Sequence, residues 1–136
     1  LVVKYNQSTK DGATDIDTTN MGAQFTMGAM SLIVSSMTKE QGTTNDEEGT
    51  GFGIKYDMGG GMTVAVSVME SEDSADVAAA TGAKEKYSSN IGEVSYTIAP
   101  GLKANLTYND FDYKAGGSGL AAEAGSITQL TINAAF

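Results

Sequence analysis

Residues 51–65 read GFGIKYDMGGGMTVA, two alternating segments joined by three glycines. The apolar side chains before and after the glycines are Phe52, Ile54, Tyr56, Met62 and Val64. A period of two predicts β-strands, and glycine permits the positive φ angles that a tight turn requires. This stretch therefore predicts an antiparallel hairpin.

The same alternation extends over the rest of the chain and gives eight predicted strands. They lie within residues 1–6, 21–27, 30–35, 52–58, 62–68, 92–98, 102–108 and 129–136. When the phase of each strand is chosen separately, one set of positions is apolar or aromatic throughout, with Gly92 as the exception. The opposite set is small or polar, apart from Val2, Ile33 and Ala65. The pattern predicts an all-β, antiparallel sheet, but a soluble sandwich would alternate in the same way.

The connections between the predicted strands distinguish the architectures. Short turns at residues 28–29, 59–61 and 99–101 alternate strictly with long polar connections at residues 10–18, 39–49, 70–86 and 110–125. The long connections hold fifteen of the seventeen acidic residues. An up-and-down transmembrane barrel has short turns on one rim and long loops on the other, so this asymmetry favours such a barrel.

The composition excludes several classes of function. The 136 residues correspond to a single domain, residues 1–136, and contain no cysteine and no histidine. Disulfides, thiolate metal sites and most of the common arrangements of catalytic residues are therefore excluded, and we expect no enzyme. A net charge of −9 without arginine argues against nucleic-acid binding. No run approaches the roughly 18 apolar residues of a membrane helix.

The final segment, residues 126–136, reads SITQLTINAAF and resembles the C-terminal strand of outer-membrane proteins. In that family the barrel assembly machinery reads a terminal aromatic residue and the alternate apolar positions before it. The matching residues here are Phe136, Ile132 and Leu130, whereas Ala134 departs from the aromatic residue usual at its position. The hairpin at residues 51–65 is also similar to the G-x-x-Y-D-x-G-G-G hairpins of general porins, notably those of alphaproteobacteria. The two resemblances together cover about residues 49–136.

The resemblance to Gram-negative general porins implies a sixteen-stranded, trimeric barrel in the outer membrane, a passive pore for small hydrophilic solutes and ions. The eight predicted strands would be the C-terminal half of such a barrel. The long loops would be extracellular, in contact with outer-membrane lipid and lipopolysaccharide, and Leu1 and Phe136 would lie at the periplasmic rim. The constriction loop of the family belongs to the other half. The chain begins within a strand pattern and without a signal peptide, as expected for part of a longer protein.

Two groups of residues are the candidate sites. The first is the predicted pore lining: Lys4, Lys55, Glu93, Lys103, Asn105 and Gln129. The second is a set of adjacent acids in the predicted extracellular loops: Asp46, Glu47, Glu48, Glu72 and Asp73. Carboxylates bind Ca²⁺ or Mg²⁺, which would bridge the protein to the anionic outer leaflet, although the spacing matches no EF-hand. No other cofactor is expected. Asp57 is interpreted as a turn residue, and Tyr5, Tyr56, Tyr96, Tyr108 and Phe136 as girdle residues at the membrane interfaces.

Two other architectures fit the same strand pattern. A complete eight-stranded outer-membrane barrel, acting as an anchor or adhesin, would need a narrow lumen filled by side chains. A soluble extracellular β-sandwich that binds a ligand would bury the apolar set. A barrel lipase is disfavoured because it would need a histidine.

Overall fold

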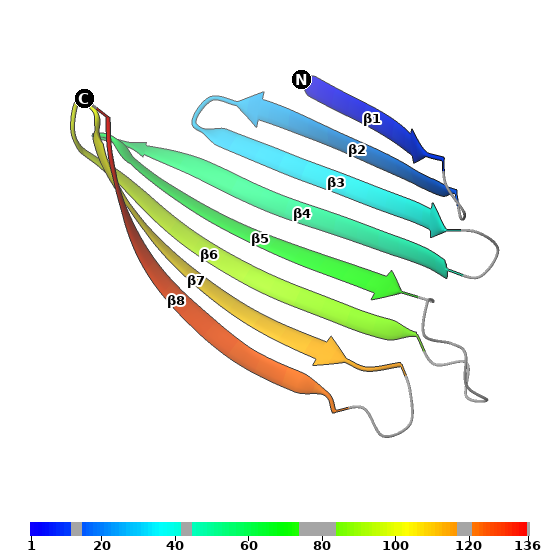
Figure 1. Cartoon of the computed structure of the whole chain (residues 1–136). Coiled ribbons are helices and arrows are strands. Elements are labelled where there is room, and N and C mark those ends of the chain that lie inside the picture. Colours follow the sequence, from blue (N-terminus) through cyan, green and yellow to red (C-terminus); the bar gives the residue numbers. More distant parts are fainter. Residues whose placement is uncertain (12–14, 42–44, 74–83, 117–120, 136) are drawn as a thin grey trace.

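The computed structural model describes residues 1–11, 15–41, 45–73, 84–116 and 121–135, which form one antiparallel sheet (Figure 1). The strands lie in the sheet in chain order, each hydrogen-bonded to the strand before it and the strand after it. They are β1 (Val2–Lys10), β2 (Ile16–Met27), β3 (Met30–Gln41), β4 (Asn45–Gly59), β5 (Met62–Asp73), β6 (Glu85–Ala99), β7 (Leu102–Lys114) and β8 (Glu123–Ala134). The predicted eight strands and their up-and-down antiparallel order are confirmed.

The short turns form where the sequence predicts them, and glycine explains why. Gly28 has φ 59° and Gly101 has φ 78°, conformations that other residues seldom adopt. Each of the three turns is also hydrogen-bonded to the turn-side end of a neighbouring strand segment. The carbonyl oxygens of Ala29, Gly61 and Gly101 accept hydrogen bonds from the backbone N–H groups of Asp57, Thr97 and Ala135 at 2.8, 2.9 and 2.7 Å. The turns thus form one continuous rim, which we call the turn side.

The strands are longer toward the other rim, the loop side, than the sequence predicts. Strand β4 begins at Asn45 and β5 runs to Asp73, so the expected bounds of the long connections are wrong. Twelve of the fifteen acids assigned to loops lie on strands instead. The strand ends escape prediction because most side chains there are polar on both faces, and the few large apolar ones lie on the opposite face from those of the belt.

The sheet has no apolar core. Among the residues that the structure describes, no apolar side chain is buried, and the fully buried side chains are Ser89 and Ser95, 1% and 2% exposed. A soluble domain of this size places most of its large apolar side chains inside. Both faces of this sheet are open instead.

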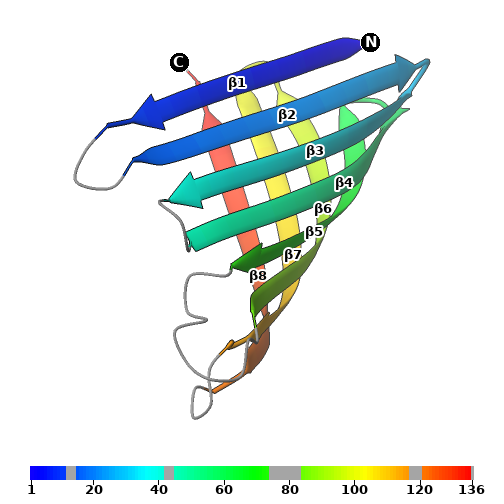
Figure 2. The ribbon, with the colours of Figure 1, turned by 90° about the vertical axis from the view of Figure 1, so that its right-hand side faces the viewer.

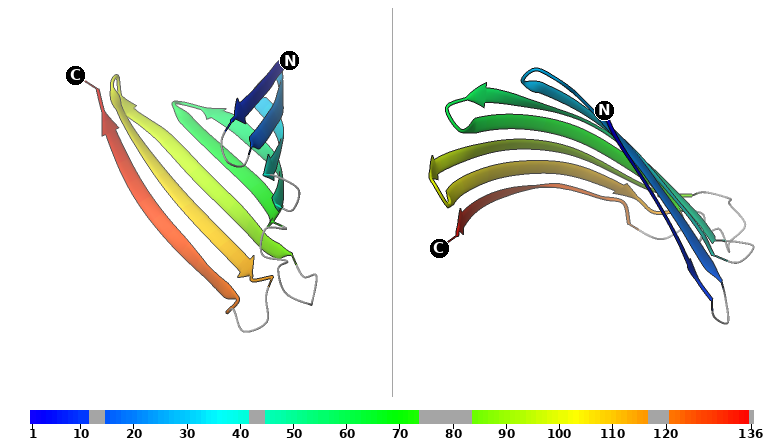
Figure 3. Two further views of the ribbon diagram at one scale, coloured as in Figure 1. Left: turned by 45° about the vertical axis from the view of Figure 1, so that its right-hand side comes forward. Right: turned by 90° about the horizontal axis from the view of Figure 1, so that it is seen from above.

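The sheet is strongly curved but does not close. Figure 2 and Figure 3 show β1 and β8 as its two free edges, and neither strand pairs with the other. These eight strands therefore form no closed barrel by themselves, and the prediction that they are half of a larger barrel stays a prediction. The strand order and the curvature are those of a segment of a barrel wall.

Candidate functional site

The register shows that the apolar positions of all eight strands lie on one face. Residues that pair across neighbouring strands point to the same side of a sheet. One row of such partners runs through Met27, Met30, Tyr56, Val64, Val94, Leu106 and Leu130. Strand β1 joins the same face through Val3 and Tyr5, which pair with Ala23 and Met21 on the side of Met27. The sequence alone left the apolar face of each strand unrelated to that of the next, and the pairing shows that all eight share one face. The predicted two-faced sheet is confirmed.

The apolar face is exposed and forms a continuous belt. Val66 is 61% exposed and Leu130 is 68% exposed, values typical of side chains that stand away from a sheet with nothing packed on them. Soluble monomers rarely expose apolar surface of this extent, which marks an interface with protein or membrane. The belt is therefore a contact surface rather than half of an internal core.

The turn-side border of the belt is oblique to the strands. The row of partners that contains Met30, the first residue of β3, reaches Leu106 on β7. The first residue of β7 is Leu102, four residues nearer to the turn. Four strand spacings separate β3 from β7, so this border shifts by about one residue per strand. With about 3.3 Å per residue and 4.8 Å between strands, the slope corresponds to a tilt of about 35°.

The loop-side border of the belt has the same slope. Met21 is the last apolar-face residue of β2 before polar side chains begin, and its row of partners leads across the sheet to Ala124 on β8. On β8, however, the apolar residues begin at Leu130, six residues beyond Ala124. The two borders are thus parallel. A belt inclined by about 35° to the hydrogen-bond rows is what strands tilted by 35–45° in a membrane require.

Aromatic residues lie near both borders. Tyr5 and Tyr108 are the last apolar-face residues toward the loop side on their strands, whereas Tyr56 and Tyr96 lie close to the turns. Tyrosine suits such positions because its ring is apolar and its hydroxyl group is polar. The arrangement agrees with the predicted girdles, except that Phe136 lies outside the described residues.

The opposite face carries all six residues of the predicted pore lining. Lys55, Glu93 and Gln129 even share one row, which also contains Ser31, Ala65 and Thr107. Hydroxyl and amide groups bond to one another across the strands: Ser95 donates to Oδ1 of Asn105 at 2.8 Å, and Ser89 donates to Oδ1 of Asn109 at 2.6 Å. We call this face the polar face. Lys4 and Lys103 complete the set on β1 and β7.

Asp57 lies on the polar face but belongs to a turn, as the sequence predicts. Its Oδ1 accepts a hydrogen bond from the backbone N–H of Gly59 at 2.9 Å. The register of β4 and β5 shifts between these two residues, so the carboxylate stabilises a bulge at the start of the turn.

The two faces exchange character beyond the loop-side border, which sequence reasoning missed. The belt side of the strands continues with polar residues, whereas the polar face there carries several apolar residues among polar ones. The apolar residues on it are Met37, Met69, Ile91, Phe111 and Ile127. The signal was present as continued alternation, but it lay in segments assigned to connections. Beyond the loop-side border, these apolar side chains therefore lie on the opposite side of the sheet from the belt.

A curved, up-and-down antiparallel sheet with an oblique apolar belt is consistent with a porin barrel, and comparison with known families agrees. A family model described as Gram-negative porin matches residues 1–116. The chain belongs to the Gram-negative porin family. The match covers β1 to β7 and so includes the N-terminal strands, for which the sequence offered only a pattern. Membership implies the outer membrane and a non-enzymatic channel. A search among curated proteins found no match.

The described part of this porin contains no helix long and apolar enough to cross a membrane.

The predicted cation-binding acids of this porin are divided between the two faces. Asp46, Glu48 and Glu72 lie on the belt side, and Glu47 and Asp73 lie on the polar face. All five lie on strands and not in loops, so their predicted location is wrong. Neighbouring residues of a strand point to opposite sides, which separates acids that are adjacent in the sequence. In the described ranges, no three acidic side chains come together as metal ligands.

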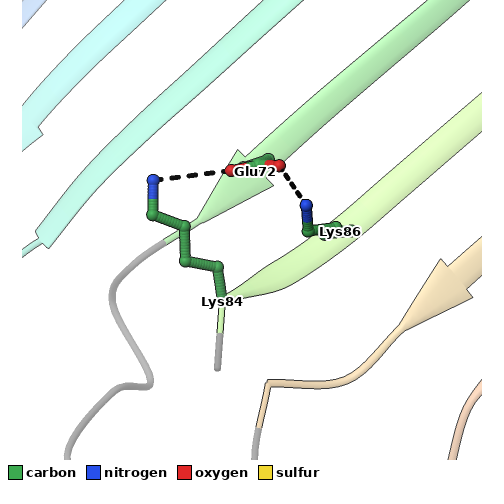
Figure 4. A network of polar contacts seen from close by, with 3 residues as sticks. All are labelled: Glu72, Lys84 and Lys86. Atoms are coloured by element: carbon green, nitrogen blue, oxygen red, sulfur yellow. Dashed lines mark hydrogen bonds and ion pairs between the residues drawn. The ribbon is translucent and has the colours of Figure 1, made fainter. Parts of the chain in front are cut away.

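Glu72 is engaged by two lysines instead (Figure 4). Lys86, its cross-strand partner on β6, donates a hydrogen bond to Oε1, and Nζ of Lys84 lies 3.4 Å from Oε2. The three residues lie beyond the apolar belt, on the loop side. The hydrogen bond and charge of Lys86 lower the pKa of Glu72, and the carboxylate in turn raises the pKa of Lys86. The trio is a surface ion pair network and leaves Glu72 a poor cation ligand.

Two of the three residues of the predicted assembly signal lie on the apolar belt. Leu130 and Ile132 point from the free edge strand β8 and are 68% and 55% exposed. Phe136 lies outside the described residues. The two described residues are placed where a partner that recognises this edge can reach them.

Proposed function

We propose that this porin chain forms part of the wall of a passive, water-filled pore through which small hydrophilic solutes and ions diffuse across the outer membrane. The observation that carries the proposal is the sheet with no apolar core, an exposed apolar belt on one face and a polar opposite face. A sheet of this kind needs hydrocarbon on one side and water on the other. The oblique borders of the belt support the same assignment, because they match tilted membrane strands.

The soluble sandwich is disfavoured by the same observation. Such a domain would pack its apolar face against a second sheet, and the described strands all belong to one sheet. The apolar side chains of this sheet remain exposed. A sandwich would also have no reason for an apolar belt that crosses its strands obliquely.

The small eight-stranded barrel is disfavoured by the free edges of β1 and β8. Unpaired backbone groups cannot remain in hydrocarbon, so further strands must pair with both edges. We propose that the eight strands are half of a sixteen-stranded barrel and that three such barrels form a trimer. The polar face supports a wide lumen, because glycine and serine occupy much of it near Gly51 and Gly53. A narrow barrel would need larger side chains there to fill its interior.

In the proposed orientation the turn side faces the periplasm and the loop side faces the exterior. Both β1, which starts at Val2, and β8, which ends at Ala134, have these ends at the turn side. The strand ends at the loop side carry most of the acids, in keeping with a surface above the membrane. Lipopolysaccharide and the barrel assembly machinery are the proposed partners, and the pore needs no cofactor.

Reconstitution of the full-length protein tests the proposed function. We expect it to partition into detergent and to give stepwise conductance that persists at moderate voltage in planar bilayers. A protein that remains monodisperse in buffer without detergent would contradict the membrane assignment. Insertion without any conductance would leave a membrane anchor and exclude the pore.

A further inference from the structure

Three lysines lie on the polar face at regular intervals across the sheet. Lys4, Lys55 and Lys103 belong to β1, β4 and β7, every third strand along the curve seen in Figure 3. All three are exposed. Their direct cross-strand partners are uncharged: Gly22, Ser31, Ala65, Thr97 and Asn133.

The three lysines also lie at a similar level of the wall, near the turn side. Lys103 is one residue from Leu102, where β7 begins, and Lys55 is four residues from Gly59, where β4 ends. Lys4 pairs with Gly22, which is five residues from the end of β2. All three are therefore on the level of the apolar belt, inside the membrane span of the wall.

These lysines are not neutralised by ion pairs. In the described ranges, the lysines in salt bridges are Lys39, Lys84 and Lys86, all on the loop side. A lysine without a carboxylate partner contributes its full charge to the lumen. The field of Lys4, Lys55 and Lys103 therefore acts on passing solutes.

Two acids lie on the polar face at the same level and reduce this charge without cancelling it. Asp57 is held in its turn by Gly59, and Glu93 lies within 3.1 Å of the Ser95 hydroxyl, which donates to it. Glu93 and Lys55 share a row but are separated by Ala65. Two strand spacings are about 10 Å, close to the Debye length at 0.1 M salt, so their mutual attraction is weak and screened.

The loop-side end of the polar face has the opposite sign. Its acids are Glu47, Asp73, Glu85 and Glu123. Glu47 is eight residues from Lys55 along β4, or about 26 Å of strand. The two ends of the face are thus too distant to neutralise each other at ordinary ionic strength.

We propose that Lys4, Lys55 and Lys103 form a cationic strip near the turn-side mouth of the pore, which favours small anions such as chloride, inorganic phosphate and short carboxylates. This inference rests on the proposed pore function and names the class of solute that this part of the wall favours. The strip acts through its field and not by tight binding, because the three lysines belong to separate strands and are exposed on an open face. It works against the acidic loop side, so the two mouths differ in their preference for ions.

The test is the reversal potential of the full-length protein in a planar bilayer under a KCl gradient at low salt. The triple variant Lys4→Gln, Lys55→Gln and Lys103→Gln should lower the chloride-to-potassium permeability ratio by about twofold or more. The effect should shrink near 1 M salt, where the Debye length is about 3 Å. Lys114→Gln, which removes the same charge from the belt side of β7 beyond the belt, is the matched control and should leave the ratio unchanged.

Two further single variants keep the proposal testable if the triple variant does not fold. Lys55→Gln alone should lower the ratio by a smaller amount, and Glu93→Gln should raise it, because it removes an opposing charge from the same row. A ratio that changes no more in the triple variant than in Lys114→Gln overturns the cationic strip while the conductance stays intact. Absence of conductance in the unmodified protein overturns the pore itself, so the two failures are distinguishable.

Discussion

Substitution of Val66 by lysine tests which face of the sheet meets lipid. Val66 is 61% exposed and is one of the two central apolar residues of β5, between Met62 and Val68 at the ends of the belt. A lysine at the middle of the lipid face of a barrel costs about 2–4 kcal/mol of folding free energy. Val66→Lys should therefore be among the most destabilising single changes in β5.

Ser67→Lys is the control, because it adds the same side chain one residue further along. Ser67 points to the polar face, where its partners are Gly53 and Ile91. Gly53 has no side chain, so a lysine at position 67 has room to extend into water. Surface substitutions of this kind change stability by about 0.5 kcal/mol or less.

Urea unfolding of the full-length protein in lipid vesicles measures the difference. With a slope of about 2 kcal/mol per molar urea, a loss of about 3 kcal/mol lowers the midpoint by about 1.5 M, and Ser67→Lys should barely move it. Equal shifts for the two variants would refute the assignment of the belt to lipid. A larger shift for Ser67→Lys would mean that the faces are reversed.

The remaining predictions concern a turn and a surface network. Gly101→Ala should lower the stability measured by urea unfolding more than Gly28→Ala does. Both glycines have positive φ, which costs alanine roughly 1–2 kcal/mol. A Cβ at Gly101 would also lie 2.5 Å from the carbonyl oxygen of Ala135, whereas a Cβ at Gly28 meets nothing within 4 Å. Equal losses of stability in the two variants would show that the backbone around Gly101 can shift to accommodate a Cβ at no cost. In an NMR titration, Glu72 should stay ionised to a lower pH than an ordinary glutamate, because Lys86 lowers its pKa. The stabilisation from this pair is fully present above the usual pKa of glutamate and is lost as the pH falls through the lowered pKa of Glu72. Lys86→Gln should raise the pKa of Glu72 toward its usual value; an unchanged pKa would contradict the assigned cause.

The sheet and its two faces were predictable because their causes are local. Glycine at positions 28, 59–61 and 101 determines the turns, and the period of two within the belt determines which side chains share a face. Lys55 and Glu93 could be assigned to the polar set of their own strands for this reason, but the pairing is needed to place them on one face. The register then shows that they share a row.

The strand ends and the acidic candidates were not predictable in the same way. Beyond the belt, Glu48 faces Glu72 across β4 and β5, and Glu47 faces Asp73, so acids from two segments alternate between the two faces. In sequence they appear as clusters such as Asp46-Glu47-Glu48, which suggest a shared site. A strand divides such a cluster, and only knowledge that the segment is a strand reveals it.

The tilt of the belt depends on sequence and pairing together. Each strand carries its own apolar stretch, which by itself has no direction in space. Pairing places these stretches side by side, and the shift of about one residue per strand emerges from the comparison of Met21 with Leu130. A belt with borders perpendicular to the strands would fit flat, stacked sheets, because no outer surface then cuts across the strands at an angle. An oblique belt of constant width fits an external plane that all strands cross at the same angle, and in the proposed function the membrane is that plane.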